Sequence, residues 1–206
     1  MDGAVEIIDQ TALPEQTRIL RLSTVEDLVD AIRRLAVRGA PALGVAGALG
    51  VALAARQYAG DPARLAAAVA AVRDARPTAV NLARGAARAA GRLAAGRDAV
   101  LAEALRVRDE EIERSAAQAR LGADLVTELC GPAPRLLTHC NTGALAAVVG
   151  GTALAAATER TGDAAGEDRC ATAPRPGRRL GHRGGRRPPD GHRRPPRLGI
   201  HPCRGG

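Results

Sequence analysis

An abrupt change in composition near residue 167 sets how much of this 206-residue chain can fold into a core. Residues 1–166 carry 19 Arg and 19 acidic residues, whereas residues 167–206 carry 11 Arg and three acidic residues. The formal net charge of +8 therefore belongs to the last 40 residues, which also hold 7 of the 13 Pro. Because that tail shows neither helical nor strand periodicity, only residues 1–166 are expected to build a core.

The N-terminal sequence MDGAVEIIDQ lacks the basic and apolar segments of a secretory signal. The most apolar stretch, residues 39–55, is 17 residues of mostly Ala and Gly, too short and too weakly apolar for a transmembrane helix. We expect it to be a buried helix of a cytoplasmic protein that binds no membrane. CxxC and Cys–His spacings are missing, so neither a metal site nor a disulfide framework is indicated for Cys130, Cys140, Cys170 and Cys203.

Residues 1–130 are expected to form a helical N-terminal domain that opens with a short β-hairpin. Ser23 and Glu26 have the spacing of a capping box, and Asp61 precedes Pro62 as a cap precedes a first-turn proline. Helical periodicity follows each of these signals. The predicted strands cover residues 5–8 and 18–22, and the predicted helices cover residues 24–36, 79–95 and 98–128, with two more beginning near residues 41 and 62.

The Pro-rich segment GPAP at residues 131–134 indicates a domain boundary. After it, residues 135–139 predict a buried strand, residues 140–143 a tight turn and residues 144–158 an apolar helix. Strand, turn and helix in this order form the first unit of a parallel α/β domain. We therefore expect an α/β protein with three parts: the helical domain in residues 1–130, a truncated Rossmann-like domain in residues 131–166 and a disordered tail in residues 167–206.

The segment VRGAP, residues 37–41, carries the first candidate binding residues. Gly39 lets a ligand approach the backbone, a starting helix offers free N–H groups, and Arg38 adds a forked cation. Together these features suit a phosphate group. A helix start with a surface arginine explains the same residues equally well.

Two further positions are candidates. Arg76 is held extended before a proline and would matter if it converged with Arg38, but a plain loop between helices, with Thr78 as a cap, is the favoured reading from spacing. Cys140 follows the predicted strand and precedes a helix start, where the helix dipole favours a thiolate. A buried, unreactive cysteine is the alternative, and the sequence does not decide between the two.

Four blocks of sequence, taken in order, resemble the methylthioribose-1-phosphate isomerase family, part of the larger group related to the regulatory subunits of initiation factor 2B. The blocks are IIDQTALP, VRGAPALG, RPTAVNL and LLTHCNTGALA followed by GTAL, and they lie between residue 5 and about residue 157. Members of this family isomerise 5-methylthioribose 1-phosphate to 5-methylthioribulose 1-phosphate in methionine salvage. The resemblance implies a helical domain paired with a Rossmann-like domain, a homodimer, and neither a metal nor another cofactor.

The resemblance also implies roles for single residues. The RGA triplet makes Arg38, Gly39 and Ala40 substrate contacts, the arginine of RPTAVNL makes Arg76 a second anchor, and the cysteine of THCN makes Cys140 catalytic. Phosphate on C1 blocks simple ring opening, so the reaction needs an acid at the ring oxygen and a base that moves the C2 proton. Cys140 would move that proton while the two arginines hold the dianion in register.

The sequence departs from the family after GTAL. The ETRP..QGARLT block, which supplies a substrate-binding Gln, and an Asp-Asn block, which supplies a second catalytic Asp, do not occur. We therefore expect little or no turnover from this chain. Two alternatives stay open: another sugar-phosphate isomerase, for example one for ribose 1,5-bisphosphate, and a noncatalytic initiation factor 2B-like or RNA-binding protein. The tail has no aromatic residues for base stacking, which favours translation in a wrong frame over an evolved nucleic-acid-binding tail.

Overall fold

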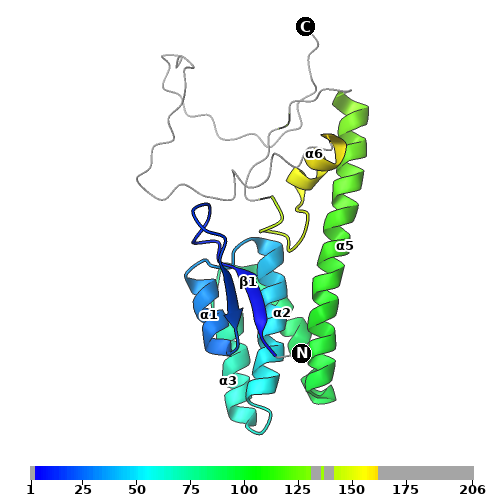
Figure 1. Cartoon of the computed structure of the whole chain (residues 1–206). Coiled ribbons are helices and arrows are strands. Elements are labelled where there is room, and N and C mark those ends of the chain that lie inside the picture. Colours follow the sequence, from blue (N-terminus) through cyan, green and yellow to red (C-terminus); the bar gives the residue numbers. More distant parts are fainter. Residues whose placement is uncertain (1–2, 131–135, 137–141, 162–206) are drawn as a thin grey trace, which may run out of the picture.

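The computed structural model describes residues 3–130, 136 and 142–161, and within them it shows a mostly helical chain with a two-stranded antiparallel sheet (Figure 1). The long helix α5 runs alongside the others, and its far end is met by α6. In chain order the elements are β1 Val5–Ile8, β2 Ile19–Leu22, α1 Val25–Arg33, α2 Ala40–Gln57, α3 Pro62–Arg73, α4 Val80–Ala90, the 3₁₀ helix η1 Leu93–Ala95, α5 Arg97–Cys130 and α6 Ala153–Thr161.

The predicted hairpin is confirmed. β1 has the predicted bounds and β2 begins one residue later than predicted, with Val5 opposite Leu22 and Ile8 opposite Ile19. The loop between the strands returns to the body of the domain, because the backbone N–H of Gln10 donates to the carbonyl of Ala36 at 3.1 Å. The hairpin thereby places the residues just after β1 next to the segment that leads into α2.

The start of α1 corrects the predicted capping box by one residue. Thr24, in an extended conformation, caps the helix: its hydroxyl accepts from the backbone N–H of Asp27, and the Asp27 carboxylate accepts from the backbone N–H of Thr24. Ser23 and Thr24 are both good caps, and the backbone conformation rather than the spacing decides between them. The helix also ends earlier than predicted, since Leu35 adopts a left-handed φ of +67°.

Helix α2 lies at the centre of the domain and packs against α1, α3, α4 and α5. It is long and apolar enough to cross a membrane by length and composition alone, yet 56% of this stretch is buried inside the folded chain. The prediction of a buried core helix is therefore confirmed. Its buried residues are Leu43, Val45, Ala46, Gly47, Ala48, Gly50, Val51, Leu53, Ala54 and Ala55.

The core compensates for the missing Phe and Trp by close helix packing. A Cβ placed on Gly85 of α4 would overlap the carbonyl oxygen of Gly44 in α2, so the two helices meet backbone to backbone there. Interiors must be filled at close to crystal density, and small residues achieve this by drawing the helix axes together. The largest apolar side chains that are fully buried are Leu28, Ile32, Leu82, Val25, Val51, Val72 and Val100.

The helices α3 and α4 follow the predicted pattern with one correction. Asp61 caps α3 by accepting from the backbone N–H of Arg64 at 3.0 Å, and Pro62 occupies the first turn as expected. Thr78, however, does not cap α4, whose N-cap is Ala79 without any side-chain hydrogen bond. The predicted helix over residues 79–95 is divided, because α4 ends at Ala90 and η1 follows after Gly91 and Arg92.

The predicted helix over residues 144–158 is wrong in its first half. Residues 142–152 form a series of turns, and α6 begins only at Ala153. Val148, Gly150 and Gly151 have positive φ angles, which no α-helix accommodates, and the N–H of Thr152 closes the loop on the carbonyl of Thr142 at 2.8 Å. Contacts with α2, described below, replace helical hydrogen bonds in this segment.

Several predictions fall outside the described residues. Residues 135 and 137–139 of the predicted strand, the turn residue Cys140 and the whole of residues 167–206 belong to this group. The division into domains at residues 1–130, 131–166 and 167–206 stays a prediction.

Candidate functional site

Segments that are far apart in the sequence meet at the N-terminal end of α2. Gly39 precedes the helix with a φ of +101°, and a Cβ at this position would come within 2.5 Å of the Cα atom of Ala146. The backbone N–H of Ala42 donates to the carbonyl of Ala146 at 2.9 Å. The VRGAPALG block is therefore packed directly on the end of the LLTHCNTGALA block.

Gln10 joins a third block to the same place. Its side-chain Nε2 donates to the carbonyl of Leu145 at 3.0 Å and to the carbonyl of Arg38 at 3.3 Å, while its Oε1 accepts from Nε of Arg38 at 3.1 Å. The residue is only 7% exposed, so these bonds form away from bulk water. One buried amide thus connects the segment after β1, the start of α2 and the turn of residues 142–152.

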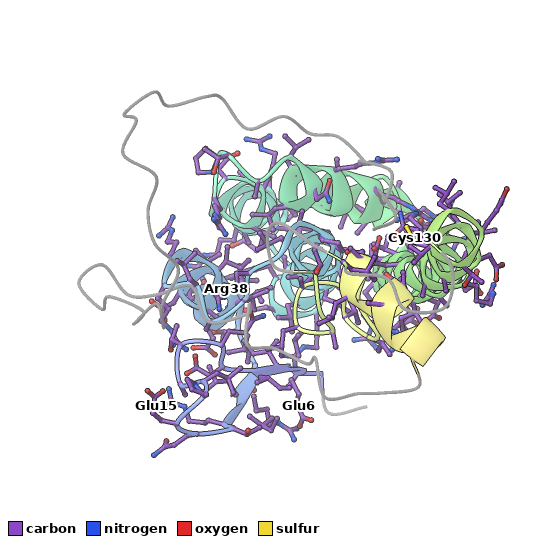
Figure 2. All side chains as sticks on the ribbon, turned by 90° about the horizontal axis from the view of Figure 1, so that it is seen from above. Glu6, Glu15, Arg38 and Cys130 are labelled. Carbon is purple, nitrogen blue, oxygen red and sulfur yellow. The ribbon has the colours of Figure 1, made fainter. Side chains whose placement is uncertain are left out.

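Arg38 is half-buried and is oriented by that amide. Figure 2 views the molecule from this end and labels Arg38 beside the start of α2. Among the described residues no carboxylate forms an ion pair with Arg38, in contrast to the neighbouring Arg18 and Arg34, which both bind Asp9. No described residue therefore accepts from the Nη atoms of Arg38 or compensates its charge.

Asp9 fixes the loop that carries Gln10. Its carboxylate is completely buried and accepts from the backbone N–H of Thr11 at 3.0 Å, from the Thr11 hydroxyl at 2.6 Å, from Arg34 at 3.3 Å and from Arg18. Burial raises the pKa of this carboxyl, but the hydrogen bonds from Thr11, Arg18 and Arg34 outweigh it and hold the pKa well below its usual range. Asp9 is therefore ionised at neutral pH and locks the segment in place.

The backbone at the start of α2 offers less than the sequence suggests. Pro41 has no N–H, and the N–H of Ala42 is already taken by the carbonyl of Ala146. The expected set of free amides is thus reduced, and the helix start contributes mainly through the small residue Gly39 and the exposed Ala40. Arg38 remains the principal group at this end that can bind an anion.

The RPTAVNL block reaches the same half of α2 from the other side. Arg76 is half-buried in the turn before α4, where its carbonyl accepts from the N–H of Ala79 at 2.9 Å, and Asn81 lies against Gly44. A cleft of about 100 Å³ is lined here by Pro41 and Gly44 of α2, Asn81, Arg84 and Arg88 of α4, and Glu110, Glu111 and Arg114 of α5. Neither Arg76 nor Arg38 lines this cleft, so it does not bring the two predicted anchors together.

Comparison with known proteins places these blocks in a family. A model of the Initiation factor 2 subunit family matches residues 36–162, which is more than half of the chain. The chain belongs to the initiation factor 2 subunit family. Both predicted arginines, Arg38 and Arg76, lie within the matched residues, as does Cys140.

Two relatives of this chain carry isomerase names. The chain is 51% identical over 160 residues to a probable bifunctional methylthioribose-1-phosphate isomerase/methylthioribulose-1-phosphate dehydratase of Nocardia farcinica, covering 75% of this chain and 29% of that protein. It is 47% identical over 167 residues to a 5-deoxyribose 1-phosphate isomerase of Moorella thermoacetica, covering 75% and 46%. The chain thus spans less than half the length of these relatives.

A solved structure supports the same grouping. The crystal structure of 5-methylthioribose 1-phosphate isomerase from Pyrococcus horikoshii matches with a TM-score of 0.69 and 29% identity, over 79% of this chain and 48% of that one. The coarse α/β expectation is confirmed to the extent that the described fold, mostly helical with a small antiparallel sheet, is that of this family.

The sequence did not predict Asp9 and Gln10 as part of the candidate site, and the predicted Cys140 lies outside the described residues. The sequence indicates no role for Asp9 and Gln10 beyond the IIDQTALP block, because no local pattern reveals the partners of Gln10, which lie 28 and 135 residues away. Within the described part of this family member, no cluster of three His, Cys, Asp or Glu side chains is placed to hold a metal ion.

Proposed function

We propose that this chain carries the substrate-anchoring part of a sugar 1-phosphate aldose–ketose isomerase, with 5-methylthioribose 1-phosphate as its substrate. The supporting observation is that Gln10 ties Arg38 to the turn at Leu145, so three of the four sequence blocks shared with this family meet around one uncompensated cation. The names of its relatives give the substrate class. In this proposal the product is 5-methylthioribulose 1-phosphate.

The proposed roles follow the chemistry of the reaction. Arg38 and Arg76 hold the phosphate dianion, Gly39 and Ala40 let the sugar approach the backbone, and Cys140 moves the proton from C2 to C1. An acid protonates the ring oxygen as its bond to C1 breaks, the C2 hydrogen moves to C1, and the C2 hydroxyl releases its proton to become the ketone, so that atoms balance. The sequence contains no Asp-Asn block to supply the second catalytic group, so the chain is proposed to bind substrate with little or no turnover.

The proposal extends to the whole protein. Residues 131–166 would begin a Rossmann-like α/β domain that follows the helical domain of residues 1–130, and the protein would act as a homodimer in the cytoplasm without a metal or another cofactor. The family match and the isomerase names of its relatives support the isomerase class on which these proposals rest.

A second substrate deserves testing beside the first. The relative from Moorella thermoacetica is named for 5-deoxyribose 1-phosphate, which differs from 5-methylthioribose 1-phosphate only in the group on C5. An anchor that binds the C1 phosphate does not distinguish the two sugars. Ribose 1,5-bisphosphate, with a second charge at C5, is the third member of the set.

Calorimetric titration of the purified chain with these three sugar phosphates tests the proposal. We expect 5-methylthioribose 1-phosphate to bind, and Arg38→Met to weaken the affinity about tenfold or more, because a charge-assisted bidentate contact is lost. Arg92→Met, at an exposed arginine before η1, is the matched control and should leave the affinity unchanged. Assays of ketose formation with and without Cys140→Ser would then show whether any turnover depends on that thiol.

The outcomes separate the open alternatives. Binding of the sugar phosphates that is equally strong in Arg38→Met would refute the proposed anchor. Failure of all three to bind, together with RNA binding that weakens steeply with salt, would support the noncatalytic alternative instead. Robust turnover by the unaltered chain would overturn the expectation of impaired catalysis.

A further inference from the structure

We propose that Gln10 is a positioning residue that holds Arg38 in place while leaving its positive charge free for a phosphate dianion. The inference deepens the proposed function, on which it rests, by naming a residue that acts through Arg38 rather than on the substrate itself. It depends on three observations: what Gln10 touches, how deeply it is buried, and what Arg38 does not touch.

The bonding pattern leaves Gln10 little freedom. Its Nε2 group spends both hydrogens on carbonyls, one from Arg38 and one from Leu145, and its Oε1 accepts from Arg38 Nε. Because the two carbonyls belong to segments 107 residues apart in sequence, the amide cannot rotate without losing bonds to both. At 7% exposure, water does not replace those bonds cheaply.

The neutrality of this partner is the decisive point. Two exposed arginines elsewhere in the domain are held by carboxylates: Arg34 by Asp9 and Asp30, and Arg88 by Glu103 and Glu110. A carboxylate in place of Gln10 would still accept from Arg38 Nε, but it could not donate to the carbonyls of Arg38 and Leu145, and it would compensate the charge that attracts an anion. An amide orients the guanidinium through Nε and leaves the outer Nη edge, which matches two phosphate oxygens, without a partner among the described residues.

The residue before Gln10, in contrast, is charged and pairs with arginines. Asp9, the preceding residue, is fully buried and binds two arginines, and the backbone N–H of Gln10 donates to the carbonyl of Ala36. The charges of Arg18 and Arg34 are therefore compensated at Asp9, whereas the charge of Arg38 is not compensated at the next residue, Gln10. The rigid loop lets Gln10 act as a fixed strut between α2 and the turn of residues 142–152.

Nuclear magnetic resonance of the arginine side chains tests the holding function without any ligand. The Nε–H signal of Arg38, identified by its loss in Arg38→Lys, should exchange slowly with water in the unaltered chain. Gln10→Met, which keeps the size but makes no hydrogen bond, should speed that exchange about tenfold. Gln10→Glu should keep the signal protected, since a carboxylate also accepts from Nε.

Titration with inorganic phosphate tests the charge. Gln10→Met should weaken phosphate binding about tenfold and Gln10→Glu by more, although only the second variant still holds Arg38. This opposite ordering of protection and affinity is a signature that loss of folding stability would not produce. Gln57→Met is the matched control, because Gln57 also makes three side-chain hydrogen bonds but at the far end of α2.

The outcomes fall into clear classes. An Arg38 signal that exchanges rapidly in the unaltered chain, or stays protected in Gln10→Met, overturns the inference, as does undiminished phosphate binding in Gln10→Glu. Phosphate binding that depends on Gln10 and Arg38, without binding of any sugar phosphate, supports the inference and contradicts the proposed substrate. Absence of both kinds of binding overturns the inference and the proposed function together.

Discussion

A glutamine that makes three side-chain hydrogen bonds lies at each end of α2, Gln57 as its last residue and Gln10 in the segment after β1, yet the two sites treat charge differently. At the C-terminal end, Gln57 accepts from the backbone N–H of Val25 and donates to Glu26 and to the hydroxyl of Tyr58, in an exposed setting. At the N-terminal end, the buried Gln10 binds a cation and two carbonyls. The hydrogen bonds of Gln57 all join protein groups to one another, whereas those of Gln10 leave the Nη atoms of Arg38 without a partner among the described residues.

Helix α2, although composed mostly of Ala, Gly and Val, therefore packs in the core along its length and positions a candidate binding residue at its N-terminal end. The C-terminal network fastens α1 to α2, and its acceptors and donors are all satisfied within the protein. The N-terminal end is equally well fastened, by Gly39 on Ala146 and by Asp9 behind the loop, but its charge is not balanced locally.

The largest expected effect is at the glycines that flank α2. Gly39→Ala should lower the free energy of unfolding by about 3 kcal/mol or more, because φ is +101° and the new Cβ meets the Ala146 backbone. Gly60→Ala, beyond the other end, meets nothing within 4 Å and should change the stability by less than about 1 kcal/mol. Urea denaturation measures both. Equal losses would remove the distinction between a packed end and an open end.

Asp9→Asn should have the next largest effect, a loss of about 2 to 3 kcal/mol at pH 7, because two arginines lose their buried anion. The folded-state pKa of Asp9 lies below its unfolded value, so this stabilisation is present above about pH 5 and disappears as the pH falls. Stability measured from pH 7 to pH 3 should therefore fall less steeply in Asp9→Asn than in the unaltered chain. Parallel curves would show that Asp9 does not anchor the loop.

Thr24→Ala tests the contribution of the N-cap of α1, which lies beside the Gln57 network at the C-terminal end of α2. The cap satisfies the first N–H groups of α1 beside the Gln57 network, and its removal should cost about 1 kcal/mol. Ser23→Ala, one residue earlier, should cost much less, since the Ser23 side chain does not cap the helix. A larger loss in Ser23→Ala than in Thr24→Ala would contradict the observed capping box.

The smallest effect is a shift in the ionisation of Tyr58. Its hydroxyl donates to Glu26 at 2.7 Å, and this hydrogen bond raises the pKa of Tyr58 above its ordinary value. Glu26→Gln should lower that pKa toward 10, followed by absorbance at alkaline pH. Gln10→Met, at the other end of the helix, should leave the titration unchanged, and a shift there would mean that the two ends are coupled.

Local signals in the sequence were sufficient for most elements. Asp61-Pro62 predicted the start of α3, and the apolar run after Pro41 predicted a buried α2, because caps, prolines and periodicity act over a few residues. The helix over residues 144–158 was mispredicted for the opposite reason. The apolar sequence of this segment favours a helix, but the contact with α2 and the positive φ angles at Gly150 and Gly151 prevent helix formation before Ala153.

The site was predicted in part. Arg38 and Gly39 were identified from their place before a helix, and the structure puts both at the meeting point of the blocks. The role of Gln10 was not accessible, because its partners lie 28 and 135 residues away and no local pattern specifies such pairs. The choice of Thr24 over Ser23 depends on a backbone conformation that neighbouring residues of the same chemistry do not reveal.

Tyr58 has a practical consequence for anyone who studies this protein by light. The sequence contains no Trp and no Phe, so this residue is the sole aromatic chromophore of the chain. Near-ultraviolet circular dichroism and intrinsic fluorescence therefore report on the Glu26–Gln57 network alone. An anion that binds beside Arg38 would be about 27 Å from Tyr58, the length of the 18-residue helix α2, and would not change the Tyr58 signal. Its binding must therefore be measured by calorimetry or nuclear magnetic resonance.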